Sequence, residues 1–178
     1  VDYFVKQPET YHGKKVVIAG GGDSALDWTI ELAPHTDSLT LIHRSSSFRG
    51  APESPDRMYQ LVQERKVDLI TNAQVVELRG DDKLEALQVE SEGRRVALQT
   101  DYFIPLFGLT PKLGPIADWG LGLEKHAIQV DPLDCSTNIK GIFAIGDINT
   151  YKGKLKLILC GFHEATMMCQ AAFHHIYP

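Results

Sequence analysis

The sequence has few cysteines, no long apolar run and no excess of positive charge. Its 178 residues include three cysteines, an odd number without CxxC spacing, so we expect neither a disulfide framework nor a cysteine-based zinc site. No apolar run approaches the roughly 20 residues that a membrane helix needs. The net charge of −5 disfavours nucleic acid or an anionic membrane as a partner.

The N-terminal residues VDYFVKQPET lack a basic segment followed by an apolar core, and therefore do not resemble a signal peptide. Together with the few cysteines, this predicts a cytoplasmic protein. The sequence does not begin with Met, so we expect a processed chain or an excised fragment. Residues 1–13 contain Pro8 and Gly13 and are interpreted as an irregular lead-in or linker.

The composition, with 43% hydrophobic and 23% charged residues, is that of an ordinary globular protein. Residues 16–19 form a short apolar run, typical of a strand buried on both faces. Three glycines follow, then an amphipathic helix that begins at Asp23 and ends near Pro34. Residues 39–42 form a second short strand. This order of strand, glycine turn, helix and strand predicts a βαβ unit and an α/β fold.

The remaining pattern predicts two domains. A helix is expected to start at Ser54-Pro55, with Ser54 as its N-cap. Further elements are a strand at 67–70, a small antiparallel meander between 75 and 98, and a strand at 102–107. From Lys112 the chain is rich in loops. There we expect strands at 128–130 and 142–145 and a helix from Gly161 to His175. The predicted domains are residues 1–111 and 112–178, and the first is a Rossmann-like three-layer domain with a β-meander.

The glycine turn fits the nucleotide-binding pattern GxGxxA at Gly20, Gly22 and Ala25. The first glycine permits the tight turn, the second lets the backbone approach a pyrophosphate, and the small third residue lets the helix pack closely on the strand. Free N–H groups at the helix N-terminus attract phosphate. The residues expected to hold a pyrophosphate are Gly20, Gly21, Gly22, Asp23, Ser24 and Ala25. The alternative is a tight turn that binds no ligand.

The end of the second strand predicts which nicotinamide nucleotide binds. An NAD site has an acidic residue about 20 positions after the glycines, to bind the ribose 2′-hydroxyl. This sequence has His43 and Arg44 there, with Arg49 shortly after. Arginine binds a 2′-phosphate through charge-assisted hydrogen bonds, so these residues favour NADP over NAD. The alternative is a solvated basic surface without a ligand.

Several motifs resemble one family of flavoproteins. The segment HRSSSFRG resembles the HRRxxFR signature of the thioredoxin-reductase-like flavoproteins. The segments YFVK, GGGDSALDW, GIFAIGD and GKLKLILCGF narrow the resemblance to ferredoxin (or flavodoxin)–NADP reductases of the thioredoxin-reductase type. The motifs agree in order over nearly the whole chain. Ser45 stands where the signature has a second arginine, which weakens the preference for NADP without removing it.

The resemblance implies a hydride transfer between NADPH and FAD, with electrons exchanged with a ferredoxin or flavodoxin. True thioredoxin reductases carry a redox CxxC just before the nucleotide-binding strand. This sequence has YFVK at residues 3–6 instead, so a dithiol relay is not expected. The proposed chemistry needs two aligned rings and no general acid or base, so no catalytic side chain is assigned.

The resemblance also implies that residues 112–178 are the C-terminal half of an FAD-binding domain. Asp147, after Gly146, would accept a hydrogen bond from the flavin ribityl chain, and the backbone at Leu157 and Ile158 would lie beside the isoalloxazine ring. The alternative for Asp147 is a simple turn cap. No second GxGxxG precedes Gly20, so the N-terminal FAD half is absent from this sequence.

A chain without that half is expected to be inactive alone. Residues 112–178 should then expose apolar surface, associate with another copy as a homodimer, or be partly disordered. Lys152, Lys154 and Lys156 form a basic cluster that could attract an acidic carrier protein, or simply a solvated loop. Two other functions stay open: a nucleotide-binding module without catalysis, and a flavin-dependent reductase of a low-molecular-weight disulfide.

Overall fold

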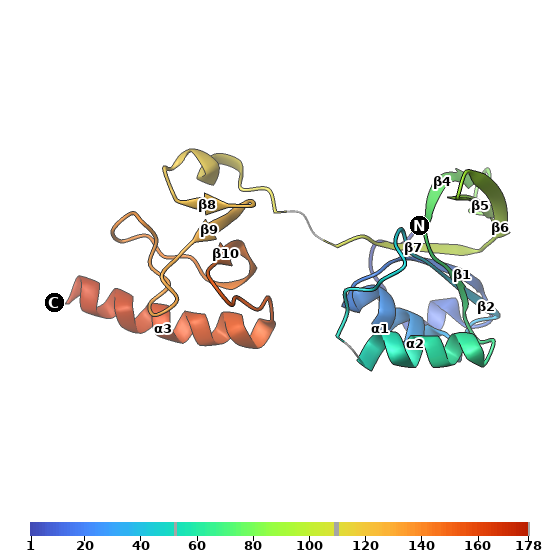
Figure 1. The fold of residues 1–178 in the computed structure, drawn as a ribbon, viewed down its shortest axis with the longest axis horizontal. Coiled ribbons are helices and arrows are strands. Elements are labelled where there is room, and N and C mark those ends of the chain that lie inside the picture. Colours follow the sequence, from blue (N-terminus) through green and yellow to red (C-terminus); the bar gives the residue numbers. More distant parts are fainter. Residues whose placement is uncertain (52, 109–110, 178) are drawn as a thin grey trace. The chain divides into compact units, whose positions relative to one another are not determined.

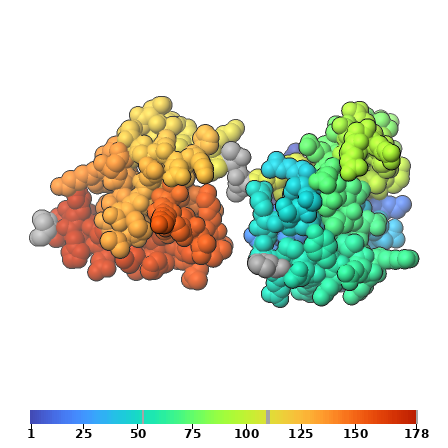
Figure 2. Space-filling view, viewed as in Figure 1, coloured from blue at the N-terminus to red at the C-terminus, as the bar shows by residue number. Residues whose placement is uncertain are grey.

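The computed structural model describes residues 1–51, 53–108 and 111–177. The chain forms two compact units, Val1–Gly108 and Leu109–Pro178. The division lies slightly before the boundary at 111/112 that the sequence suggests. Figure 2 distinguishes the units by colour, blue to yellow-green for the first and yellow to red for the second.

The first unit is built on a four-stranded parallel sheet in the order β3-β2-β1-β7. Its strands are β1 (Lys15–Gly20), β2 (Ser38–Ile42), β3 (Asp68–Ile70) and β7 (Tyr102–Leu106). Alternate side chains of β1 point to opposite faces, and Val16 to Ala19 are all buried. The sequence prediction of a strand covered on both faces is therefore confirmed.

The two faces of this sheet carry different layers (Figure 1). On one face, helices α1 (Asp23–Leu32) and α2 (Glu53–Gln63) pack against Val16 and Ile18 through residues such as Leu26 and Met58. On the other face lies the antiparallel meander β4-β5-β6, formed by residues 73–79, 86–91 and 94–99. Leu87 of β5 packs there against the β1 residue Val17. The three-layer α/β architecture is thus as the sequence predicts.

The N-terminal residues are part of the folded unit, contrary to the expected linker. They include a short 3₁₀ helix, η1 (Pro8–Tyr11), and the Tyr11 ring is buried against Tyr102 of β7. The Tyr11 hydroxyl donates to Asp2 Oδ2 at 2.9 Å, and Asp2 N–H donates to Phe103 O at 2.9 Å. A linker was predicted because the segment is irregular and contains Pro8 and Gly13. Such a local pattern does not reveal that one aromatic residue anchors the segment to the fold.

Helix α2 also begins earlier than expected. It starts at Glu53, which places Ser54 inside its first turn and not at the N-cap. The Ser54 hydroxyl donates to Asp27 Oδ1 of α1 at 3.4 Å. This side chain therefore links the two helices.

Over residues 111–177, the second unit has two short 3₁₀ helices, three short strands and one long helix. They are η2 (Gly114–Asp118), β8 (Leu123–Glu124), β9 (Ala127–Gln129), η3 (Gly146–Ile148), β10 (Asn149–Thr150) and α3 (Ile158–Ile176). The expected strand at 142–145 is wrong. Only an isolated bridge pairs Phe143 with Ser136, since these segments meet in a tight hydrogen-bonded loop and not in an extended ladder. Helix α3 begins at Ile158, before the predicted start at Gly161. Gly161 therefore lies inside the first turn of the helix.

Candidate functional site

The first glycine of the turn is required by space. Gly20 ends β1, and a Cβ at this position would lie 2.5 Å from Leu106 O and 2.7 Å from Ala25 Cβ. Gly20 does not have a positive φ. The close approach of β1, β7 and α1 therefore explains this glycine and the small, fully buried Ala25.

Gly22 has the opposite environment. It is the N-cap of α1, and a Cβ built on it meets nothing within 4 Å. The first N–H groups of a helix, here those of Asp23 and Ser24, have no partner within the helix. Both residues are exposed. The N-terminus of α1 thus combines open space, unpaired donors and the positive end of the helix dipole, as an anion site requires.

Gly21 makes room for His43, which follows β2. A Cβ at Gly21 would overlap the His43 imidazole ring. That ring is only 5% exposed, stacks on Phe48 at 4.9 Å, and has Nε2 within hydrogen-bond distance of Ser45 Oγ (2.9 Å) and Ser47 O (3.1 Å). His43, which was predicted to read the 2′-phosphate together with Arg44 and Arg49, therefore lies inside the loop, and its contacts are those of a residue that shapes it.

Two further hydrogen bonds fold this loop onto the glycine turn. Arg49 N–H donates to Gly21 O at 2.7 Å, and Ala51 N–H donates to Asp23 Oδ1 at 2.8 Å. The Asp23 carboxylate is therefore engaged with the loop. A carboxylate repels a phosphate, so at Asp23 only the backbone N–H is suited to contact an anion.

Arg44 and Arg49 are both exposed, and neither forms an ion pair within the part of the chain that the structure describes. They belong to the loop that these two hydrogen bonds, one to Gly21 O and one to the Asp23 carboxylate, hold against the N-terminus of α1. Ser45 donates to Ser47 O at 3.0 Å and so also stabilises the loop. The first unit thus presents two cations, in the loop after β2, next to a helix N-terminus that is suited to an anion.

The second group of predicted residues lies in the other unit. Gly146 has a φ of +76°, and Asp147 beside it is exposed in η3. Leu157 is the N-cap of α3 and Ile158 its first residue. A Cβ at Gly161 would lie 3.5 Å from Gly146 Cα, so the first turn of α3 lies directly against the Gly146 turn. The structure therefore brings the four predicted residues to one region of the unit.

Sequence reasoning missed the residue that joins these segments. Glu164 of α3 is 3% exposed, and its Oε2 accepts from Gly146 N–H at 2.8 Å and from Asn149 Nδ2 at 3.0 Å. Its Oε1 accepts from the Tyr151 hydroxyl at 2.8 Å and from Lys154 Nζ. Burial alone would raise the pKa of Glu164, but the hydrogen bonds outweigh it and lower this pKa. The bond to Glu164 raises the pKa of Tyr151 to about 12.

This arrangement corrects the interpretation of the lysine cluster. Lys152 and Lys156 are exposed, but the Lys154 side chain is only 5% exposed and forms a buried ion pair with Glu164. Lys154 is therefore not available to attract a carrier protein. The signal in the sequence was weak, because ten residues separate the two partners and nothing in the intervening segment marks them as a pair.

Comparison with known proteins identifies the family. The family model "Pyridine nucleotide-disulphide oxidoreductase" matches residues 3–174. The chain belongs to this family. In the curated proteins, a "Ferredoxin--NADP reductase" of Flavobacterium johnsoniae is 59% identical over 179 residues, which cover 100% of this chain and 51% of the relative. One from Parvibaculum lavamentivorans is 52% identical, with 100% and 52% covered. The chain spans about half the length of the curated relatives it matches.

Solved structures support the same pyridine nucleotide-disulphide oxidoreductase fold. Thioredoxin reductase of Lactococcus lactis has a TM-score of 0.81 at 24% identity and covers 96% of this chain and 55% of that one. Bacillithiol disulfide reductase of Staphylococcus aureus has a TM-score of 0.80 at 22% identity, covering 97% and 54%. At these identities the likeness shows the fold alone, and it confirms the predicted Rossmann-like class.

The family's name includes disulphide chemistry, but the cysteines here are not arranged for it. Cys135 is buried, Cys160 is half-buried, Cys169 is exposed, and all three are free. Burial, with the Glu164 charge nearby, raises the pKa of Cys135 and so disfavours its thiolate. Within the described residues, no cluster of three or more His, Cys, Asp or Glu residues could hold a metal ion. No described helix is long and apolar enough to cross a membrane.

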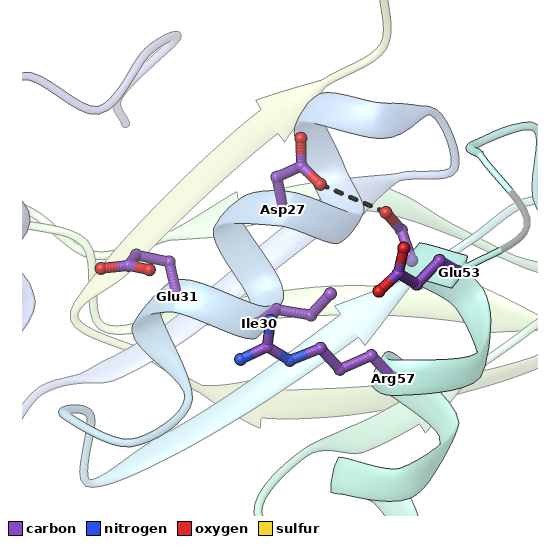
Figure 3. Close-up of a pocket in the computed structure, with 6 residues that line it drawn as sticks. Asp27, Ile30, Glu31, Glu53 and Arg57 are labelled. Carbon is purple, nitrogen blue, oxygen red and sulfur yellow. Dashed lines mark hydrogen bonds between the residues drawn. The ribbon is translucent and has the colours of Figure 1, made fainter.

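None of the predicted nucleotide residues lines either of the two cavities found in the described part of the first unit. One, of about 230 Å³, lies between α1 and α2 (Figure 3). Asp27, Ile30 and Glu31 line it from α1, and Glu53 and Arg57 from α2. The mixed charges and open position indicate a solvated groove between two surface helices. The candidate nucleotide site is instead an open surface at the N-terminus of α1.

Proposed function

We propose that this chain is the NADP(H)-binding domain and the C-terminal half of the FAD-binding domain of a flavin-dependent ferredoxin (or flavodoxin)–NADP reductase. The observation that carries the proposal is the identity of 49–59% over the entire chain to proteins named "Ferredoxin--NADP reductase". The assignment of residues 1–111 and 112–178 to these two domains is part of the proposal.

The nucleotide site would be formed by the glycine turn and the loop after β2. The open space at Gly22 fits a pyrophosphate, which would accept hydrogen bonds from the N–H groups of Asp23 and Ser24. Arg44 and Arg49 would bind the adenosine 2′-phosphate through charge-assisted hydrogen bonds. His43 would hold the loop in place from inside it.

The flavin would be held at the turn between Gly146 and Asp147. Asp147 is exposed and, with its neighbour's positive φ, is presented on a tight turn. The backbone at Leu157 and Ile158 would border the ring. When bound, FAD supplies hydride acceptance from NADPH and transfer of single electrons to a carrier. The side chains here orient and shield the cofactors, so the proposed catalysis is mainly the alignment of two rings.

The remaining parts of the proposal are a ferredoxin or flavodoxin as the carrier, a homodimer and a cytoplasmic location. The absence of CxxC supports a carrier over a thioredoxin-type disulfide as the electron acceptor. Two alternative functions can be distinguished from this one. Flavin content distinguishes a non-catalytic module, and acceptor preference distinguishes a reductase of a small disulfide.

The nucleotide preference is tested by Arg44→Glu. We expect the affinity for NADPH to fall about 10-fold or more, because a carboxylate would replace a cation at the 2′-phosphate. The affinity for NADH, which lacks that phosphate, should change little. Fluorescence titration with each nucleotide measures both. Arg65 lies outside the loop, is exposed and has no ion pair among the described residues, so Arg65→Glu offers a matched control. Equal losses for NADPH and NADH would contradict the assignment.

The proposed reaction is tested on the complete enzyme that contains this chain. The visible absorption spectrum reports bound flavin, and NADPH oxidation coupled to reduction of a ferredoxin reports turnover. A flavin-free complete protein would contradict the proposal and favour the non-catalytic module. A flavoprotein that reduces a small disulfide but no carrier protein would favour the third function.

A further inference from the structure

The structure shows one carboxylate that ties together segments far apart in the sequence. The four side-chain and backbone donors to Glu164 come from η3, β10 and the loop that leads to α3. Its own backbone carbonyl accepts from Cys135 Sγ at 3.8 Å. In the described part of the chain, Glu164 is the only carboxylate side chain that is buried. A buried charge is costly unless it is paired and hydrogen-bonded, and both carboxylate oxygens here are engaged.

The position of this carboxylate links the two halves of the proposed flavin site. Gly146, whose N–H donates to Glu164, directly precedes Asp147. Glu164 belongs to α3, the helix whose first residue is Ile158. Neither N-cap residue of these two helices, Ile145 of η3 or Leu157 of α3, forms a side-chain capping hydrogen bond. The tie through Glu164 is therefore the main polar restraint between the Asp147 turn and the N-terminus of α3.

We propose that Glu164 is a positioning residue that fixes the Gly146–Asp147 turn against the first turn of α3 and thereby sets where the flavin ring lies. The inference rests on the proposed function and deepens it. Lys154 supplies the positive charge that keeps the carboxylate ionised in its buried place. Glu164 does not touch a cofactor itself. Its effect reaches the flavin through Gly146 and through α3.

Two variants of the complete enzyme separate positioning from simple stabilisation. The double variant Lys154→Met/Glu164→Leu replaces the ion pair by apolar side chains of similar size, a change that proteins often tolerate. It removes the acceptor of Gly146 N–H. The matched control, Lys154→Met alone, also lacks the ion pair but keeps the Glu164 carboxyl group as that acceptor. Any difference between the two therefore reports the loss of the Glu164 side chain and not the loss of the ion pair.

The readouts are the visible circular dichroism of the flavin, the rate of flavin reduction at saturating NADPH, the KM for NADPH and the melting temperature. We expect the double variant to change the flavin spectrum and to slow reduction about 10-fold or more, because displaced rings react slowly. The KM for NADPH should stay the same, since the nucleotide residues are in the other unit. Lys154→Met should change the spectrum and the reduction rate less than the double variant does, because its Glu164 carboxyl group still accepts from Gly146 N–H.

The inference is overturned if the double variant has the wild-type flavin spectrum and reduction rate, even with a lower melting temperature. Glu164 would then be only a structural residue. If the double variant does not fold, Glu164→Gln replaces it. The Gln side chain has one acceptor oxygen and cannot accept from the donors to both Glu164 oxygens. We therefore expect the same changes in flavin spectrum and reduction rate, and their absence would also overturn the inference. A wild-type enzyme that binds no flavin would instead overturn the proposed function, and this inference with it.

Discussion

At the scale of single residues, the three glycines of the turn serve three different purposes. Gly20 allows three elements to approach closely, Gly21 leaves room for the His43 ring, and Gly22 leaves space open to solvent. None of the three has a positive φ. The GxGxxA pattern predicted the turn, but it contains no information about His43, which lies 22 positions after Gly21. The pattern therefore predicted the turn and not the residue that shapes the neighbouring loop.

The substitutions Gly21→Ala and Gly22→Ala should have different effects on stability and similar effects on binding. The Gly21→Ala methyl group would collide with His43, so we expect a loss of about 1–3 kcal/mol in the free energy of unfolding and a displaced arginine loop. The Gly22→Ala methyl group meets no protein atom and should cost about 1 kcal/mol or less. Both substitutions should weaken the binding of NADPH. Urea unfolding and fluorescence titration measure the two quantities, and undiminished NADPH binding by Gly22→Ala would contradict the pyrophosphate site.

The pH dependence of stability should report Glu164. Its pKa in the folded protein is below its ordinary value of 4.5, so its ionised form is favoured by folding. That contribution is fully present above the unfolded pKa and is lost as the pH falls through the folded pKa. At about pH 7, Glu164→Gln should cost about 3–5 kcal/mol, because it leaves Lys154 buried and unpaired.

The difference in the free energy of unfolding between wild type and Glu164→Gln should therefore shrink as the pH falls below about 4.5. Urea unfolding of both proteins at several pH values measures it. Glu77→Gln is a suitable control. The Arg79 hydrogen bond lowers the pKa of Glu77 too, but this carboxylate is exposed on the surface and its removal should matter little at any pH. A wild-type advantage that stayed constant down to about pH 3 would contradict the role of the ionised carboxylate.

At the scale of elements, the sequence predicted best where local pattern and tertiary packing agree. Strand β1 is apolar throughout because the sheet is covered on both faces, and α1 begins at the predicted Asp23. Prediction failed where one long-range contact decides the outcome. The buried Tyr11 joins the N-terminal residues to the fold, and the first turn of α3, which includes Gly161, lies against Gly146.

The meander offers a matched test of how the sheet is covered. Leu87 of β5 is fully buried against the parallel sheet, and its direct register partner Leu78 of β4 is 49% exposed. Leu87→Ala should cost about 2–5 kcal/mol, as other buried leucines do. Leu78→Ala should cost about 0.5 kcal/mol or less. Chemical unfolding of both variants measures the costs, and equal values would show that the meander does not form the second face of the core.

At the scale of the whole molecule, each unit has its own core, and the second unit also exposes a group of large apolar side chains on one helix. In the second unit, several large side chains at the beginning of α3 are more than half exposed, among them Ile158 (84%), Leu159 (78%) and Phe162 (71%). Exposed apolar surface was one of the three outcomes that the sequence predicted for this segment, beside association with another copy and partial disorder, and the structure shows such surface. Since the chain spans about half of its relatives, we interpret this surface as the face toward the other half of the proposed FAD domain.

Two separate cores should also make the two units respond differently to ligand. We expect two calorimetric transitions for the chain, and only the transition of the first unit should shift with NADPH. A ligand that binds only the native state at 100 times its dissociation constant stabilises it by about 2.7 kcal/mol. NADH at the same concentration should shift it less, because it lacks the 2′-phosphate that Arg44 and Arg49 would bind. The Leu87→Ala variant assigns the transitions, since it should lower only the one that responds to NADPH. An NADPH-induced shift of both transitions, or of the other one alone, would place the nucleotide outside the glycine turn.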